Sequence, residues 1–243
     1  MLKAILFDLD DTLLGNDMDD FLPGYFKLLG GYAAHYFSPE QFLEELRICT
    51  EAMVQNVDPT VANRDVFWSL FAERTGKDPN EMEAFFETFY LEQFGQLQGL
   101  TQKRPFASQL VQYCFDHQLD VVVATNPLFP MVAIEARLEW AGLPVNQYDF
   151  SLVTSYENMH AAKPHPAYYA EILEKIDCPP EQALMVGNDW ENDIVPANAL
   201  GIESFWLSLN GAAPPDEQPV PYGRTLQDVH TFLAARLERE VAK

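Results

Sequence analysis

Residues 3–12 of the chain read Lys-Ala-Ile-Leu-Phe-Asp-Leu-Asp-Asp-Thr. The apolar run over Lys3–Phe7 is typical of a buried strand, and Asp8 follows directly at its end. In an extended segment Asp8 and Asp10 point to the same side, where their carboxylates repel each other. A hard divalent cation offsets such repulsion, although Asp-x-Asp alone also fits a turn or a helix cap. The stretch therefore predicts a buried strand with a candidate cation site at its carboxyl end.

Strand and helix patterns alternate over much of the remaining chain. Four further stretches have the composition of strands: Asp120–Ala124, Phe150–Thr154, Ala183–Val186 and Glu203–Leu207. Apolar residues recur at helical spacing in four others: Pro105–His117, Pro130–Ala141, His165–Ile176 and Ile194–Leu200. Gly142 and Gly201 follow two of these and fit helix C-terminal positions. The alternation predicts an α/β fold with a doubly wound, parallel, Rossmann-like sheet, whose ligands bind at the carboxyl ends of the strands.

The segment 15–99 has a different pattern. It shows no convincing strand, and its apolar and aromatic residues recur at helical spacing, which predicts four helices. Pro39, Pro59 and Pro79 each fall near an expected helix start, where proline is tolerated. Because the segment interrupts the alternation after the first strand, we interpret it as an inserted helical cap. Residues 1–14 and 100–243 would then form the α/β catalytic core.

Polar residues stand where ligands of such a sheet are expected. Thr125-Asn126 ends the second strong strand, and a hydroxyl with nearby N–H groups can bind phosphate oxygens. Lys163 precedes a helix and offers a positive charge. Asp189 and Asp193, in the stretch Gly-Asn-Asp-Trp-Glu-Asn-Asp after the third strong strand, lie one helical turn apart. Each of these signals alone also fits a turn or an exposed side chain.

The composition limits the partners of the chain. A net charge of −22 over 243 residues disfavours nucleic acid and anionic membranes, and a phosphate site would need local positive charge from a metal or a lysine. We expect no membrane span and no signal peptide, because no stretch reaches ~20 apolar residues and Asp8 comes too early. Cys49, Cys114 and Cys178 are far apart with no CxxC pair, which indicates reduced thiols and a cytoplasmic protein.

Four motifs occur in order: Asp-Leu-Asp-Asp-Thr at residues 8–12, Thr-Asn at 125–126, Lys-Pro at 163–164 and Gly-Asn-Asp-Trp-Glu-Asn-Asp at 187–193. With the helical insertion, this set resembles the haloacid dehalogenase-like superfamily over essentially the whole chain. The resemblance implies a phosphatase acting on a small phosphorylated metabolite. Asp8 would be the nucleophile that forms an aspartyl-phosphate, and Asp10 the general acid that then acts as base.

The resemblance also implies Mg²⁺ as cofactor, held by the Asp8 carboxylate, the backbone carbonyl of Asp10 and Asp189. The last motif of the family occurs with three or four residues between its acids. Asp189 and Asp193 fit the three-residue form, whereas the four-residue form places Asn188 at the first acid. We therefore expect Asp189 to be the ligand and Asn188 an auxiliary group.

Further positions have supporting roles by the same resemblance. Thr125, Asn126 and Lys163 match the groups that hold the phosphoryl oxygens. Asp193 matches an acid that supports the waters of the metal or Lys163. Thr12 would orient the first loop through its hydroxyl.

The same motifs also allow other functions of this core. A sugar phosphomutase would share these motifs, whereas haloacid dehalogenases need no metal and lack an acid where Asp10 stands. The complete set of acids and lysine argues against a binding protein without activity. Arg47 and Arg64 in the helical segment are interpreted as surface salt bridges rather than substrate ligands. The sequence leaves the substrate and the oligomeric state open.

Overall fold

One parallel sheet forms the centre of the α/β part. The computed structural model describes residues 1–215 and 219–241. The six strands lie in the order β5-β4-β1-β6-β7-β8, and each neighbouring pair is parallel. They are β1 (Ala4–Phe7), β4 (Asp120–Val123), β5 (Leu152–Val153), β6 (Ala183–Gly187), β7 (Glu203–Leu207) and β8 (Tyr222–Gly223). The strand order reverses at β1, so the predicted doubly wound α/β fold is confirmed.

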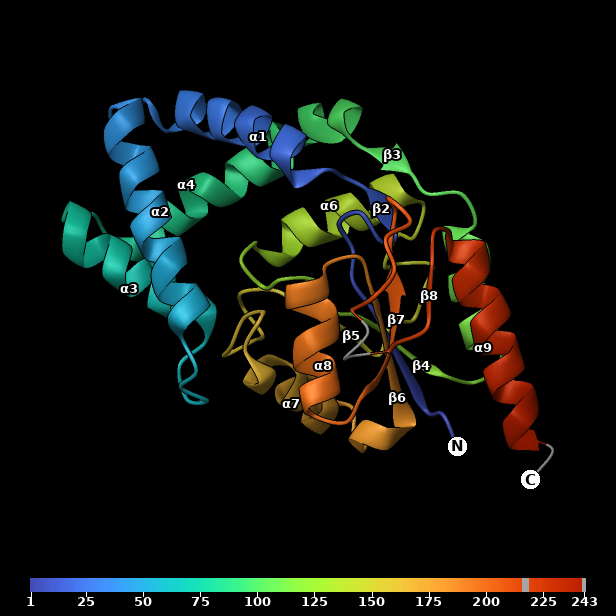
Figure 1. The fold of residues 1–243 in the computed structure, drawn as a ribbon. Helices are drawn as coiled ribbons and strands as arrows, with labels where there is room; N and C mark the ends of the chain where they lie inside the picture. Colours follow the sequence, from blue (N-terminus) through green and yellow to red (C-terminus); the bar gives the residue numbers. More distant parts are fainter. Residues whose placement is uncertain (216–218, 242–243) are drawn as a thin grey trace.

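Helices cover both faces of this sheet (Figure 1). They are α5 (Ala107–Asp116), α6 (Met131–Ala141) and α9 (Leu226–Val241) on one face, and α7 (Pro166–Lys175) and α8 (Val195–Ala199) on the other. Successive side chains of a strand point to opposite faces. Ile5 and Phe7 of β1 accordingly join the buried cluster of α5, α6 and α9, whereas Ala4 and Leu6 join that of α7 and α8.

Some elements differ from the sequence prediction. β5 is shorter than the predicted Phe150–Thr154, because it lies at the edge of the sheet and pairs only with β4. The predicted helix Ile194–Leu200 is preceded by a π-helical turn over Trp190–Ile194 and continues as α8. Helix α9 and strand β8 were not predicted. Gly142 and Gly201 have φ angles of 81° and 83°, which confirms their helix C-terminal positions.

The chain between β1 and β4 contains the expected helices. They are α1 (Met18–Ala33), α2 (Pro39–Gln55), α3 (Asn63–Thr75) and α4 (Pro79–Glu92), followed by the 3₁₀ segment η1 (Phe94–Leu100). Ser38 and Asp78 cap α2 and α4, because their side chains accept a hydrogen bond from the backbone N–H three residues later. Pro39 and Pro79 are the first helical residues, whereas Pro59 lies in a turn ahead of α3.

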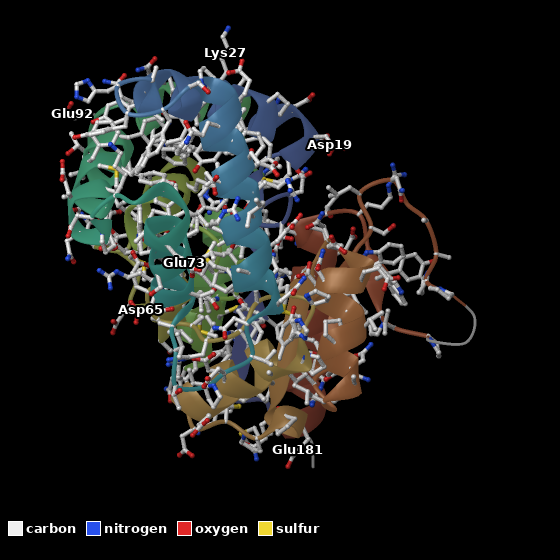
Figure 2. The ribbon with its side chains drawn as sticks, turned by 90° about the vertical axis from the view of Figure 1, so that its left-hand side faces the viewer. Asp19, Lys27, Asp65, Glu73, Glu92 and Glu181 are labelled. Carbon is white, nitrogen blue, oxygen red and sulfur yellow. The ribbon has the colours of Figure 1, made fainter. Side chains whose placement is uncertain are left out.

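Two short strands link these helices to the sheet region. β2 (Leu14–Gly15) and β3 (Gln102–Lys103) pair in antiparallel orientation, so the chain leaves and returns at neighbouring points. Figure 1 shows α1–α4 gathered on one side of the α/β part and α9 on the opposite side. In Figure 2, Lys27 of α1 lies at the end of the molecule farthest from Glu181. The division into a core and a cap at residues 15 and 99 stays a prediction.

Aromatic rings fill the space between α1–α4. Phe71 of α3 is fully buried, and its ring centroid lies 5.7 Å from that of Phe37 and 5.6 Å from that of Trp68. Phe94 of η1 stacks on Trp140 of α6, with 5.2 Å between the centroids. The apolar core therefore runs without interruption from the helices to one face of the sheet.

The cysteines are buried free thiols, as predicted from their spacing. In residues 1–215 and 219–241, no helix combines the length and the apolar character that a bilayer crossing requires.

We predict that Phe71→Ala lowers the free energy of unfolding by about 3–5 kcal/mol, because the lost ring leaves a cavity among aromatic neighbours. Urea denaturation followed by circular dichroism measures the change. Leu91→Ala on α4 is the control, since that side chain is 69% exposed, and it should change stability by less than about 0.5 kcal/mol. Equal effects of the two substitutions would contradict the packing described here.

Candidate active site

Loops that follow adjacent strands meet at one cleft. β1 lies between β4 and β6, so the carboxyl ends of the three strands are neighbours. A cleft of about 360 Å³ opens at this edge. The residues singled out from the sequence that line it are Asp8, Asp10, Thr125, Asn126, Lys163, Asn188, Asp189 and Asp193. The fold thus brings these side chains together, and their chemical roles stay predictions.

Lys163 lies between two buried carboxylates. Its Nζ is 2.8 Å from Oδ1 of Asp8 and 2.6 Å from Oδ1 of Asp193. The N–H of Asp8 donates to the carbonyl of Val186 at 2.9 Å, which continues the pairing of β1 with β6 and positions Asp8 at the strand end. One ammonium facing two carboxylates leaves an excess of negative charge in this cluster.

Burial and charge shift the protonation of these groups. Burial raises the pKa of Asp8 to about 7, against the opposing effect of the Lys163 ammonium. Burial also raises the pKa of Asp193, again opposed by Lys163. Burial alone would lower the pKa of Lys163, but the carboxylates of Asp193 and Asp8 raise it well above its usual range. The lysine is therefore charged, and further positive charge in the cleft would favour the ionised Asp8 that a nucleophile requires.

A glycine makes room for Asp193. A Cβ atom on Gly187 would lie 2.1 Å from Oδ2 of Asp193, far inside contact distance. The same oxygen accepts a hydrogen bond from the N–H of Asp189 at 3.0 Å. The absence of a side chain at Gly187 thus permits the approach of the carboxylate that Lys163 contacts.

Asp10 is held from two sides. Nδ2 of Asn16 donates to its Oδ1 at 2.7 Å, and Nη1 of Arg137 donates to its Oδ2 at 2.5 Å. Arg137 belongs to α6, is 1% exposed, and its guanidinium lies 4.6 Å from the ring centroid of Phe129. Both carboxylate oxygens of Asp10 are thus engaged by neighbours outside the Lys163 cluster.

Asn16 and Arg137 were not identified from the sequence. Arg137 lies three residues after Ile134 and four after Ala133, on the buried apolar face of α6. An arginine at such a position is a usable signal, because a buried guanidinium needs an acidic partner. The signal does not name the partner, since Asp10 is 127 residues away in the chain.

Asn188 and Asp189 have different surroundings. Oδ1 of Asn188 accepts a hydrogen bond from the hydroxyl of Thr12 at 3.2 Å, which joins the last motif to the first. Oδ1 of Asp189 accepts from the N–H groups of Glu191 and Asn192, both at 3.0 Å, and Oδ2 accepts from the side chain of Asn192 at 2.7 Å. Asp189 therefore caps the π-helical turn. Both residues are thus engaged by neighbours, and the choice of Asp189 or Asn188 as the metal ligand stays a prediction.

The loop after β4 is tied to its neighbours. The carbonyl of Thr125 accepts hydrogen bonds from the hydroxyls of Thr154 at 2.7 Å and Tyr168 at 2.8 Å. Oδ1 of Asn126 accepts from the N–H of Lys163 at 3.3 Å. The Thr125 and Asn126 side chains thus line the cleft beside the lysine, and phosphate binding by them remains a prediction.

The cleft is strongly acidic. The carboxylates that line it belong to Asp8, Asp10, Asp11, Asp17, Asp19, Asp189 and Asp193. Among the described residues, Lys163 is the single lysine or arginine in the lining. Over the same part of the chain, no three His, Cys, Asp or Glu side chains gather in an arrangement that could hold a metal ion. Carboxylates, backbone carbonyls, amide oxygens and waters are the ligands that a hard cation takes in proteins.

Comparison with known proteins places the chain in a family. The sequence model described as haloacid dehalogenase-like hydrolase matches residues 2–201. A ribulose-1,5-bisphosphate 5-phosphatase of Halopiger xanaduensis is 27% identical, over 84% of this chain and 84% of its own length. A phosphoglycolate phosphatase of Pectobacterium atrosepticum is 28% identical, over 85% and 80%.

Solved structures agree at the level of the fold. A 2-haloacid dehalogenase from Pseudomonas syringae superposes with a TM-score of 0.64 at 22% identity, over 97% of this chain and 99% of its own. The family match extends from the first strand through the last of the four motifs. The chain belongs to the haloacid dehalogenase-like hydrolase family.

Proposed function

We propose that the chain is a Mg²⁺-dependent phosphatase that hydrolyses the phosphomonoester of a small metabolite through an aspartyl-phosphate on Asp8. The observation that carries the proposal is the buried contact of Lys163 with Oδ1 of Asp8 at 2.8 Å, at the wall of the cleft. Within the described residues, no hydrogen bond reaches Oδ2 of Asp8, so this oxygen can attack a phosphorus atom. The names of the two phosphatase relatives support the same class of reaction.

The proposed hydrolysis has two steps, formation of the aspartyl-phosphate and its reaction with water. An oxygen of Asp8 attacks phosphorus, the bond to the leaving oxygen breaks, and Asp10 gives that oxygen a proton. Water then attacks the phosphorus of the aspartyl-phosphate, Asp10 accepts a proton from the water, and phosphate departs while the Asp8 carboxylate is restored. The ammonium of Lys163 and the polar side chains of Thr125 and Asn126 hold the phosphoryl oxygens.

Arg137 acts as a positioning residue for Asp10. Asn16 and Arg137 each bond one oxygen of Asp10, and each oxygen keeps a second lone-pair site for the proton that Asp10 exchanges. The guanidinium holds the carboxylate of Asp10 in place through this contact.

The oxygen donors in the cleft suit Mg²⁺. The cleft has an excess of carboxylates, and oxygens of Asp8 and Asn188 with the backbone carbonyl of Asp10 would hold the ion. When bound, Mg²⁺ would supply positive charge that attracts the phosphate and favours the ionised form of Asp8. This set takes Asn188 rather than Asp189, since Oδ1 of Asn188 accepts one hydrogen bond, from Thr12, whereas both carboxylate oxygens of Asp189 accept hydrogen bonds within the π-helical turn.

We predict that Asp8→Asn abolishes release of p-nitrophenol from p-nitrophenyl phosphate, because the amide cannot attack phosphorus. Asp10→Asn should lower turnover by about 10²–10⁴-fold and accumulate the aspartyl-phosphate, which mass spectrometry detects. Asp20→Asn, at an exposed carboxylate of α1, should keep wild-type turnover. Wild-type turnover in the Asp8→Asn protein would rule out the mechanism.

We predict that Arg137→Met lowers kcat by about 10–100-fold, because Asp10 loses the contact that positions it. KM should change less than about threefold, since Arg137 does not line the cleft. Arg137→Lys should recover part of kcat by restoring the charge. Melting curves confirm that both variants are folded at the assay temperature. An unchanged kcat in Arg137→Met would contradict the positioning role.

We predict that Asn188→Asp tightens Mg²⁺ binding and Asn188→Leu weakens it by at least about tenfold, because a carboxylate binds Mg²⁺ more strongly than an amide. Calorimetric titration with Mg²⁺ measures the affinity without turnover. Asp189→Ala should keep the affinity and lower stability by about 1 kcal/mol through loss of the cap. A large loss of affinity in Asp189→Ala alone would restore Asp189 as the ligand.

A further inference from the structure

A large cavity adjoins the cleft. Its volume is about 760 Å³, and it lies between the helices α1–α4 and residues 128–132. Met18, Leu128 and Phe129 line both spaces, so the cavity begins where the cleft ends. Cavities of this size hold whole small-molecule ligands. A phosphoryl group beside Asp8 would leave its attached organic group facing this cavity.

The cavity wall is largely apolar. Leu22 and Phe26 of α1 and Leu46 of α2 are half-buried and line the space. The hydroxyls of Tyr25 and Tyr90 lie 2.7 Å apart and bond to each other. Burial raises the pKa of both phenols, so they stay neutral. This wall favours an aromatic or aliphatic occupant.

The charged groups of the cavity are mostly acidic. Among the described residues, Arg64 is the single arginine or lysine in the lining. Its Nε donates to Glu83 at 2.6 Å, its Nη2 makes a second bond to the same carboxylate, and the hydroxyl of Tyr156 donates to Glu83 at 3.1 Å. Further carboxylates in the lining belong to Glu87, Glu135 and Glu157. The one guanidinium is therefore already paired.

Other cations of the helical segment lie elsewhere. Arg47 forms ion pairs with Glu44 and Glu51 of its own helix and does not line the cavity. Lys27 lies at the outer end of the molecule in Figure 2. A second phosphate or carboxylate in the cavity would therefore meet carboxylates and a paired arginine, without a cation to compensate its lost hydration.

We propose, building on the phosphatase function proposed above, that the substrate is a phosphomonoester with a large aromatic or aliphatic organic group and no second anionic group. The proposed substrate class differs from the substrates for which the two relatives are named. Ribulose bisphosphate carries a second phosphate and phosphoglycolate a carboxylate. The apolar wall binds the organic group, and the acidic lining disfavours a second anion.

The first test compares kcat/KM of the full-length wild-type protein with Mg²⁺ across substrates. The series contains four alkyl phosphates (ethyl, butyl, hexyl and octyl), 1-naphthyl phosphate, and two substrates with a second anionic group, phosphoglycolate and ribulose-1,5-bisphosphate. We expect kcat/KM to rise by up to about fourfold per added methylene. Naphthyl phosphate should exceed both anionic substrates by at least about tenfold. A flat alkyl series, or a preference for the anionic substrates, overturns the inference while the phosphatase function stands.

A binding measurement separates the two proposals. Calorimetry compares (1-naphthylmethyl)phosphonate with phosphonoacetate, neither of which can be hydrolysed at a phosphomonoester bond. We expect the naphthyl compound to bind at least about tenfold more tightly. If no ester is hydrolysed, the phosphatase proposal fails, and this comparison still decides the preference of the cavity. Equal or tighter binding of phosphonoacetate overturns the inference.

Two leucines on one helix provide matched variants. Leu46→Lys places a cation in the cavity lining, whereas Leu43→Lys places one at an exposed position of α2 that does not line it. We expect Leu46→Lys to weaken binding of the naphthyl phosphonate by about tenfold and to strengthen binding of phosphonoacetate. Leu43→Lys should change neither. Identical behaviour of the two variants contradicts the placement of the organic group in this cavity.

Discussion

The buried contact of Lys163 with Asp8 and Asp193 is the constraint on which the rest of the site depends. It joins the loop after β1, the loop ahead of α7 and the turn after β6, and it connects residues 155 positions apart in the chain. Without the ammonium, two carboxylates would be buried side by side, which is strongly unfavourable. Gly187 leaves the space that this arrangement needs. The parallel sheet and its strand order serve to bring these three loops to one point.

Two carboxylates that are neighbours in the sequence have different partners in the fold. Asp8 faces Lys163 and the cleft, and burial raises its pKa to about 7. Asp10 faces α6, where Arg137 and Asn16 hold both of its oxygens. The separation suits a nucleophile and a proton-transfer group, because each must be held in its own environment. Helix α6 thereby takes part in the proposed chemistry although it carries none of the four motifs.

In the proposed function, the cleft binds the phosphoryl group of the substrate and the adjoining cavity binds its organic group. The cleft combines one ammonium with many carboxylates, so a phosphate there depends on added positive charge. The cavity combines an apolar wall with carboxylates, and its guanidinium is paired with Glu83. The proposed selectivity for a large organic group without a second anion follows from this division. The acidic residues of this chain thus have two effects: in the cleft they make phosphate binding depend on added positive charge, and in the cavity they disfavour a second anionic group.

The sequence alone determined the fold class and the strand-end residues that gather at the cleft, although not Asn16, because apolar runs and the polar residues that end them are local patterns. It also located the helical segment, but α9 was missed although Leu226, Val229, Leu233 and Leu237 recur at helical spacing. The strands β2, β3 and β8 have two residues each, too few to form a pattern. Tertiary structure decided that Arg137 contacts Asp10, that Asp189 caps a turn while Asn188 meets Thr12, and that a cavity adjoins the cleft. Apart from the cap at Asp189, whose partners Glu191 and Asn192 are close in the chain, these features arise from contacts between distant segments, which local spacing does not encode.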